Sequence, residues 1–176
     1  GSCSATFTIT NKCPYTVWPG ILSRAGPSPL STTGFALQSG ESTAVAVPAD
    51  TRFLIATPPV TLAEFRLNGT GGADLYEVSL VDGFNLPMKV KPRGGTTGAG
   101  SCKATGCVMD LNVACPTELK VARDGESVAC NSSCKTRALP CLSSEFFKSA
   151  FPNDRASFTC VSADYIITFC PTSSKR

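Results

Sequence analysis

Histidine is absent from this chain of 176 residues, and no pair of its cysteines has the CxxC spacing. Without histidine, the chain has no Ser-His-Asp or Cys-His nucleophile, and no side chain whose ordinary pKa suits a general base near neutrality. A zinc site would need four thiolates, and the spacings of the cysteines do not suit one. We therefore expect no metal and no cofactor, and any catalysis must come from carboxylates.

The chain also lacks a long apolar run and a block of five like charges. Crossing a bilayer takes roughly 20 apolar residues, so we expect no transmembrane segment. The 16 basic and 13 acidic residues give a formal net charge of +3. Because this charge is not clustered, nucleic acid is not an expected partner. With 42% hydrophobic and 16% charged residues, the composition is that of one globular domain.

Ten cysteines stand out against these absences, and eight of them lie beyond residue 100. Their even number favours disulfides over the alternatives, which are a metal site or free thiols. Disulfides persist in oxidising compartments, so we expect a secreted or lumenal protein. Gly1-Ser2 is typical of a processing remnant, which predicts that a secretory signal has been removed. Asn68 and Asn131 begin N-glycosylation sequons that fit the same route.

The first hundred residues read as short strands separated by glycine and proline. Residues 5–9 alternate apolar side chains with threonine, which predicts a half-buried strand. Residues 62–67 place three apolar side chains on one face, with Glu64 and Arg66 on the other. Further strands are expected at residues 42–47, 51–56, 74–81 and 84–91.

The second half of the chain carries a hairpin signal and one helix signal. Residues 118–122 and 126–130 flank Arg123-Asp124-Gly125, which is typical of a tight β-turn. Ser143-Ser144-Glu145 starts the only credible helix, which should last about two turns before Pro152. Two closing strands are expected at residues 157–160 and 165–169. The pattern predicts an all-β sandwich or barrel with a small cysteine-rich appendage.

Five stretches of the chain, taken in order, resemble corresponding stretches of one known family. They are ATFTITNKCPYTVW at residues 5–18, TLAEF at 61–65, YEVSLVDGFNLPM at 76–88, CKATGC at 102–107 and DYIITFCP at 164–171. On these residues the chain resembles the thaumatin-like proteins, the fifth family of pathogenesis-related proteins, over its whole length. The resemblance implies an all-β fold, a flattened β-sandwich core at residues 3–114 and 156–171 with one short helix. The disulfide-rich loop appendage would span residues 115–155, abbreviated here as in short members of the family.

The resemblance also implies four disulfides, namely Cys13–Cys170, Cys102–Cys160, Cys115–Cys130 and Cys134–Cys141. The family partner of Cys107 would fall near Phe151, where this chain has no cysteine. Cys3 precedes the usual first residue and is also left over, so elimination predicts a Cys3–Cys107 bridge. Two alternatives stay open: both thiols are free, or Cys3 pairs between chains.

In the family, an arginine and four acidic residues line a cleft. The resemblance carries these roles to Arg52, Glu64, Asp74, Glu77 and Asp154. Glu77 stands where an aspartate is usual, which lengthens that side chain by one methylene. Tyr76 and Phe84 are the aromatic candidates for stacking against sugar rings in the cleft, with core packing as the alternative.

The residues themselves also point to two of these acids. A turn centred between Thr70 and Gly71 would place Glu64 directly opposite Glu77 on paired strands. Like charges so placed destabilise a sheet, so the pair needs a compensating cation or a functional reason. Asp74 has the opposite strand parity from Glu77, and it joins the pair only from the turn or past a bulge. A structural ion-pair network is the alternative to a binding cleft.

Three functional hypotheses follow. The first is an antifungal defence protein of the plant type, which is monomeric and secreted to the apoplast or the vacuole. It would bind β-1,3-glucan of the fungal cell wall, or another cell-wall polysaccharide, through the acidic cleft. The second is an inhibitor of a microbial glycosidase such as xylanase, with basic loops that suit an acidic enzyme cleft. The third is a weak endo-β-1,3-glucanase, in which Glu64 and Glu77 supply the two carboxyls. A nearby arginine would lower the pKa of both and disfavour a proton donor.

Overall fold

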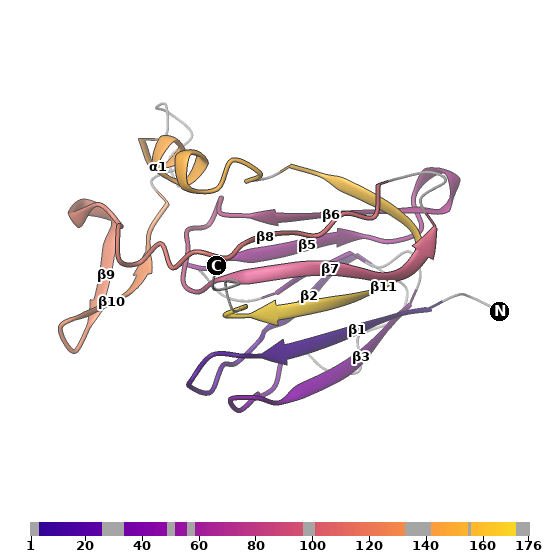
Figure 1. The fold of residues 1–176 in the computed structure, drawn as a ribbon, viewed down its shortest axis with the longest axis horizontal. Helices are drawn as coiled ribbons and strands as arrows, with labels where there is room; N and C mark the ends of the chain where they lie inside the picture. The colour runs from indigo at the N-terminus through magenta and orange to yellow at the C-terminus, as the bar shows by residue number, and fades with distance from the viewer. Residues whose placement is uncertain are drawn as a thin grey trace, which may run out of the picture.

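The computed structural model describes residues 4–25, 34–48, 52–55, 59–96, 101–132, 142–154 and 156–171. Within them, a curled sheet of nine strands forms the body, and a two-stranded hairpin and one helix stand to one side (Figure 1). The sheet strands are β1 (Ser4–Asn11), β2 (Ile21–Ala25), β3 (Ser42–Pro48), β4 (Arg52–Ile55), β5 (Leu62–Arg66), β6 (Ala73–Ser79), β7 (Met88–Thr96), β8 (Thr105–Cys107) and β11 (Phe158–Phe169). The hairpin strands are β9 (Lys120–Arg123) and β10 (Glu126–Cys130), and helix α1 is Leu142–Ala150. The predicted all-β class with one short helix is confirmed.

Strand β11 organises the sheet because it pairs with three other strands. Residues 158–161 pair antiparallel with β6, residues 161–169 antiparallel with β7, and residues 165–169 parallel with β1. The strand order is β2-β4-β5-β6-β11-β1-β3, and β7 and β8 leave this path at β11. The sheet therefore curls around β11 and encloses a core between its two parts (Figure 1).

An aromatic cluster fills this core. Phe7, Phe65, Tyr76 and Tyr165 are each at most 3% exposed. The ring centroids of Phe7 and Phe65 lie 4.7 Å apart, and those of Phe65 and Tyr165 lie 5.0 Å apart, both in edge-to-face arrangements. Burial of each phenylalanine contributes on the order of 1.5–3 kcal/mol. The apolar alternation in β1 and β5 thus supplies the side chains that hold the two parts together.

Most elements lie where the sequence predicts them. The hairpin turns at Asp124 and Gly125, whose φ angles of 51° and 80° are the left-handed pair that a two-residue turn needs. Helix α1 ends at Ala150, before Pro152. No helix among the described residues is long and apolar enough to cross a membrane. The division into a core at residues 3–114 and 156–171 and an appendage stays a prediction.

Three differences concern strands. The prediction of two separate closing strands is wrong, because residues 161–164 keep pairing with β7 and join them into one strand of 12 residues. The sequence also does not predict β2 or β8. Strand β8 has only three residues with glycine in the middle, so it offers no alternation to recognise.

Three of the predicted disulfides are present, Cys13–Cys170, Cys102–Cys160 and Cys115–Cys130. The first joins the segment after β1 to the residue after β11, across a sequence separation of 157. Cys134 and Cys141 lie outside the described residues, so their bridge stays a prediction.

The predicted bridge between Cys107 and Cys3 is wrong. Cys107 is a buried free thiol whose Sγ lies 3.7 Å from the carbonyl oxygen of Met109. Burial raises the pKa of this thiol to about 11, which keeps it protonated. Cys3 itself lies outside the described residues.

The topology gives the physical reason. Register pairs run from Cys107 through Met88 and Phe169 to Asn11, so Cys107 belongs to the Asn11 end of the sheet. Ser4 stands at the opposite end of β1, about 23 Å from Asn11 at the rise of a strand. Bridged cysteines have Cα atoms at most about 7 Å apart. The sequence predicts the Cys3–Cys107 bridge only because these two cysteines are left without partners, and that reasoning takes no account of the distance between the two ends of the sheet.

Candidate functional site

Two glutamates on neighbouring strands face each other on the outer side of the sheet. Strands β5 and β6 pair antiparallel with Glu64 directly opposite Glu77, and both side chains are half-buried. The register follows from the tight turn Thr70–Gly72, in which Gly71 has a φ of 70° that glycine adopts without strain. Opposed side chains have Cβ atoms about 4.5–5.5 Å apart. The register predicted from the sequence is confirmed.

Polar groups surround this pair. The hydroxyl of Ser157 donates a hydrogen bond of 3.0 Å to Glu77 Oε2. Arg66 is exposed and lies on the same face of β5 as Glu64. Arg52 pairs in register with Arg66, so its backbone lies beside this face, while its side chain is outside the described part. The outer side of β5 and β6 is thus a polar strip that contains two opposed carboxylates.

Asp154 lies beside the strip rather than in it. The backbone N–H of Leu80 donates a hydrogen bond of 2.7 Å to Asp154 Oδ1. Phe158 lies opposite Tyr76, and continuing this register brings residue 154 to the level of Leu80. That is three residues beyond Glu77, about 10 Å along the strand. One carboxylate oxygen of Asp154 therefore accepts a hydrogen bond from the backbone just after the end of β6.

Asp74 does not join the pair. It is 6% exposed and points into the core, where its Oδ2 accepts a hydrogen bond of 2.8 Å from the hydroxyl of Tyr165. Its Oδ1 accepts a bond of 2.9 Å from the backbone N–H of Asn68 and so closes the turn between β5 and β6. Asp74 lies in regular strand opposite Cys160, without the bulge that would have turned it outward. Its predicted place in the cleft is therefore wrong.

The two aromatic candidates are also core residues. Tyr76 is 1% exposed, and its hydroxyl donates a hydrogen bond of 2.6 Å to the carbonyl oxygen of Lys103. Burial raises the pKa of Tyr76 to about 12. Phe84 is fully buried, and its backbone exchanges hydrogen bonds of 2.9 and 2.8 Å with Cys130. Neither ring is available to a sugar, because both fill the space between elements.

The two sequons differ in exposure. Asn68 is exposed at the turn after β5, whereas Asn131 is half-buried and its backbone N–H donates a hydrogen bond of 2.7 Å to Leu119. An attached glycan needs an exposed asparagine, so Asn68 is the better placed of the two. Glycosylation of either residue stays a prediction.

Sequence reasoning missed three residues that matter for binding. Ser157 precedes β11, and its bond to Glu77 becomes visible only once the pairing of β11 with β6 is known. Trp18 and Asn112 line a pocket at one end of the sheet. Trp18 lies in the stretch at residues 5–18 that carries the family resemblance, but neither that resemblance nor any spacing assigns a binding role to Trp18 or Asn112. Among the predicted cleft residues whose side chains the structure describes, it brings together only Glu64 and Glu77, with Asp154 nearby.

Comparison with known proteins agrees with the fold. The Thaumatin family model matches residues 11–54 and 50–149. Pathogenesis-related protein 5 of Arabidopsis thaliana is 38% identical over 218 aligned positions, which cover 94% of this chain and 90% of that protein. A Prunus avium protein named glucan endo-1,3-beta-glucosidase is 38% identical over 229 positions, covering 97% of this chain and 92% of that protein. Both alignments exceed the 176 residues of this chain, so the relatives carry segments that it lacks.

A solved structure has the same architecture. The thaumatin-like xylanase inhibitor TLXI matches with a TM-score of 0.51 and 18% identity, covering 94% of this chain and 99% of that chain. At this identity the likeness concerns the fold alone. Since the family model matches more than half of the residues and the relatives align over nearly the whole chain, the chain belongs to the thaumatin family.

Proposed function

We propose that this chain is a secreted defence protein that binds fungal cell-wall β-1,3-glucan through the outer side of β5 and β6. Membership of the thaumatin family and a relative named pathogenesis-related protein 5 support a plant defence protein. The three disulfides support secretion, because such bonds persist in oxidising compartments.

The opposed pair Glu64 and Glu77 is the observation that carries the proposal. Like charges directly opposite each other cost a sheet stability, and a binding role would explain why both are kept. A sugar ring has several hydroxyl donors, and two neighbouring carboxylates offer acceptor oxygens at a spacing that one ring can bridge. Ser157 holds one oxygen of Glu77 in place, which orients that carboxylate before a ligand arrives.

The test is retention of the purified protein on insoluble β-1,3-glucan, with soluble laminarin as competitor. We expect binding that laminarin competes away, and about tenfold weaker binding in Glu64→Gln and Glu77→Gln. That loss corresponds to one hydrogen bond to a charged acceptor, about 1.5 kcal/mol. Glu118→Gln is the matched control, because Glu118 is exposed on the short helical turn before β9, off the sheet.

The melting temperature separates a binding role from a structural one. A binding role predicts that each glutamine variant loses retention without a large loss of melting temperature, because glutamine keeps the size of the side chain and its carbonyl oxygen can still accept hydrogen bonds. Unchanged retention together with a lower melting temperature would assign the pair to a structural ion-pair network and end the proposal.

A basic row on β7 supports a second candidate function, inhibition of a microbial glycosidase such as a xylanase. Lys89, Lys91 and Arg93 occupy alternate positions of β7 and are all exposed, so they share one face. Such a row complements an acidic substrate cleft. Inhibition of fungal xylanases should weaken with added salt and in a Lys89→Glu/Lys91→Glu variant. No inhibition at micromolar protein across several enzymes would end this candidate.

The same glutamate pair supports a third candidate, a weak endo-β-1,3-glucanase, and one relative carries such a name. Hydrolysis needs two carboxyls, one of which donates a proton. Release of reducing sugar from laminarin that disappears in Glu64→Gln and Glu77→Gln would make the chain an enzyme. Release that survives both substitutions would come from a contaminant or another site.

A further inference from the structure

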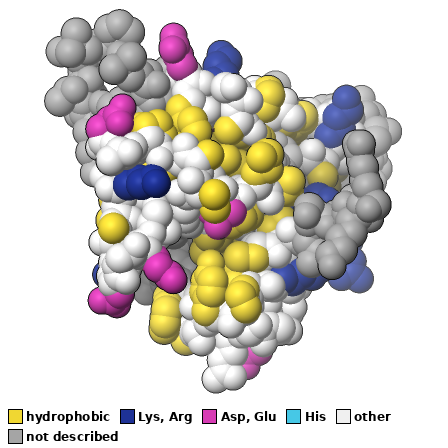
Figure 2. Space-filling view, turned by 60° about the vertical axis from the view of Figure 1, so that its left-hand side comes forward, with side chains coloured by type: hydrophobic (Ala, Val, Ile, Leu, Met, Phe, Trp, Pro, Cys, Tyr) yellow, Lys and Arg dark blue, Asp and Glu magenta, His cyan; other side chains and the backbone are white. Residues whose placement is uncertain are grey.

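A pocket of about 600 Å³ lies where the β9–β10 hairpin meets the end of the sheet. We call it the Trp18 pocket; Tyr15, Trp18, Asp110, Asn112 and Glu126 are among the residues that line it. Its volume is within the range of about 300–1,000 Å³ of small-molecule sites. Neither Glu64 nor Glu77 lines it, so it is separate from the pair on the outer strip. Figure 2, which brings the hairpin end forward, shows hydrophobic side chains gathered over the middle of this face around a carboxylate residue.

One wall of the pocket is aromatic and exposed. Trp18 is 72% exposed and Tyr15 is 52% exposed, although large aromatic side chains are usually mostly buried. Trp18 faces outward because its neighbour Val17 is 5% exposed and exchanges backbone hydrogen bonds of 3.0 and 2.9 Å with Leu37. The backbone thus fixes where the indole lies. Two exposed aromatic side chains therefore line one concave site.

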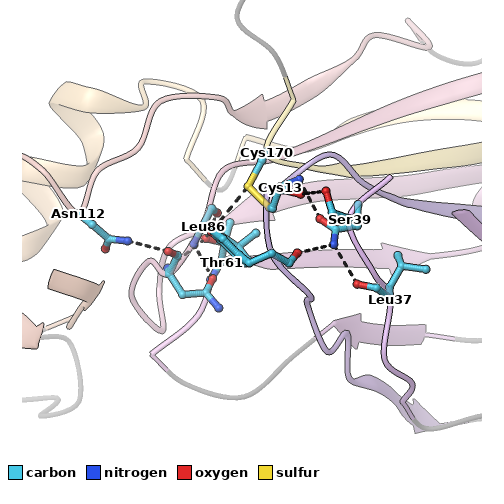
Figure 3. The surroundings of a disulfide bond; sticks show 10 residues. Cys13, Leu37, Ser39, Thr61, Leu86, Asn112 and Cys170 are labelled. Carbon is cyan, nitrogen blue, oxygen red and sulfur yellow. Dashed lines mark hydrogen bonds between the residues drawn. A yellow bond between two sulfur atoms is a disulfide. The ribbon is translucent and has the colours of Figure 1, made fainter. Parts of the chain in front are cut away.

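The frame behind this wall is rigid. The Cys13–Cys170 disulfide joins the ends of β1 and β11 (Figure 3), and the hydroxyl oxygen of Tyr15 lies 3.8 Å from Cys170 Sγ. The side-chain amide of Asn11 donates hydrogen bonds of 2.8 Å to the carbonyl oxygen of Tyr15 and 2.9 Å to that of Leu37. A site fixed in this way loses little conformational entropy when a ligand binds.

The opposite wall is the hairpin, and Asn112 connects it to the pocket floor. Asn112 is 8% exposed, and its Nδ2 donates a hydrogen bond of 2.7 Å to the carbonyl oxygen of Asn85 (Figure 3). It donates a second bond, of 3.4 Å, to the carbonyl oxygen of Val128 in β10. Its Oδ1 has no hydrogen-bond partner among the described residues. A buried acceptor without a partner costs about 1–3 kcal/mol, so a donor that reaches it gains more than an ordinary hydrogen bond.

The charges of the lining select the class of ligand. Asp110 and Glu126 contribute two carboxylates and Arg123 one guanidinium, which leaves an excess of one negative charge. Burial and the charge of Asp110 raise the pKa of Tyr15, so its phenol stays protonated and can donate. An anionic ligand is disfavoured by this lining, whereas a neutral ligand rich in hydroxyl groups finds both acceptors and donors.

We propose that the Trp18 pocket binds a short neutral oligosaccharide. A sugar ring presents C–H groups on its faces and hydroxyls around its edge, which matches aromatic faces at the wall and carboxylates at the rim. The ring faces pack on Trp18 and Tyr15, and the hydroxyls bond to Asp110 and Glu126. This inference shares no residue with the Glu64–Glu77 strip, so it stands or falls separately from the proposed glucan site.

Trp18 is the only tryptophan of the chain, so its fluorescence reports on this pocket alone. The probes are laminarihexaose and xylohexaose as neutral ligands, and oligogalacturonate as the anionic comparison. With a neutral probe at saturation, we expect a blue shift of the emission and at least twofold weaker quenching by acrylamide. The anionic probe should leave both unchanged. Unchanged emission and quenching at millimolar concentrations of both neutral probes would overturn the proposal.

Calorimetric titration of variants assigns the binding to residues. Trp18→Ala should weaken oligosaccharide binding at least tenfold, and Trp18→Phe should restore part of it, since a ring face remains. Val113→Ala is the matched control, because Val113 is 81% exposed and does not line the pocket. Full affinity in Trp18→Ala would overturn the proposal and leave the exposed aromatic residues as a surface for a protein partner. Loss in Trp18→Ala with full binding by Glu64→Gln and Glu77→Gln would uphold the pocket while ending the proposed role of the strip.

Discussion

At the scale of single residues, strand parity decides the role of each carboxylate in β6. Asp74 and Glu77 are three positions apart, so their side chains point to opposite faces of the strand. Asp74 accepts a hydrogen bond from Tyr165 in the core, whereas Glu77 meets Glu64 and Ser157 on the outer side. A role carried over from a family by position alone therefore has to be checked against the face on which the residue lies.

The tyrosines give a prediction at this scale. Burial raises the pKa of Tyr76 to about 12, and burial together with the Asp74 carboxylate raises that of Tyr165 well above its usual value. Burial and the charge of Asp110 raise the pKa of Tyr15 as well. In an ultraviolet titration of the native protein, we expect Tyr76 and Tyr165 not to ionise near the usual pKa of about 10, and Tyr15 to ionise at a higher pH than in the unfolded chain. In concentrated urea, where the chain is unfolded, all three tyrosines should ionise near pH 10.

The same shifts set the direction of an alkaline effect on stability. Between about pH 10 and 12 the unfolded chain has lost tyrosine protons that the folded chain still binds, so the free energy of unfolding should fall as the pH rises. Tyr165→Phe is the control, since it removes the most strongly shifted group. A native transition near pH 10 with two thirds or more of the total amplitude would show that Tyr76 or Tyr165 is in water and would contradict this account.

At the scale of elements, close backbone approach explains a strand that the sequence does not reveal. In β8, Gly106 has a φ of 154°, and a Cβ added there would overlap the carbonyl oxygen of Met88 and lie 2.6 Å from the Cα of Lys89. Only glycine lets β8 approach β7 in this way. The three-residue strand depends on that contact rather than on an alternating pattern.

Two glycine substitutions test this explanation. Gly106→Ala has to displace backbone atoms of β7, and we expect it to lower the free energy of unfolding by about 3 kcal/mol or more. Gly40 also has a positive φ, 83°, but a Cβ there meets nothing within 4 Å. Gly40→Ala should therefore cost only the conformational strain, about 1 kcal/mol. If urea denaturation gave the same loss in the free energy of unfolding for Gly106→Ala and Gly40→Ala, crowding between β8 and β7 would have no effect on stability.

Local patterns predict much of the fold and only part of the site. Alternation predicts β1 and β5, and the position of the turn predicts the Glu64–Glu77 register, because each depends on neighbours in the chain. The merging of the closing strands into β11 depends on β7, and the burial of Phe84 depends on the hairpin that contains Cys130. The Trp18 pocket depends on several segments at once. Such features follow from tertiary pairing, which no single stretch of sequence contains.

At the scale of the whole molecule, one disulfide supports both the fold and the proposed pocket. Cys13–Cys170 closes the ends of β1 and β11, the strand that joins the two parts of the sheet, and the segment with Tyr15 and Trp18 begins just after Cys13. The stability of the sheet and the shape of the Trp18 pocket are therefore linked. Cys115–Cys130 instead links the hairpin to the preceding loop and closes a loop of only 15 residues in sequence separation.

The two bridges should differ in stabilisation because they restrict the unfolded chain to different extents. By loop-closure entropy, a separation of 157 residues corresponds to about 5 kcal/mol and one of 15 residues to about 3 kcal/mol. We expect Cys13→Ser/Cys170→Ser to lower the free energy of unfolding by about 2 kcal/mol more than Cys115→Ser/Cys130→Ser, as measured in urea. Replacing both cysteines of a bridge avoids a free thiol that could exchange. A larger loss in the Cys115→Ser/Cys130→Ser variant would mean that native contacts of the hairpin outweigh loop entropy.

The same two variants also show which bridge fixes the wall of the Trp18 pocket. In the folded form of each variant, acrylamide quenching of Trp18 reports how exposed the indole is. We expect this quenching to change when Cys13–Cys170 is removed and to stay the same when Cys115–Cys130 is removed.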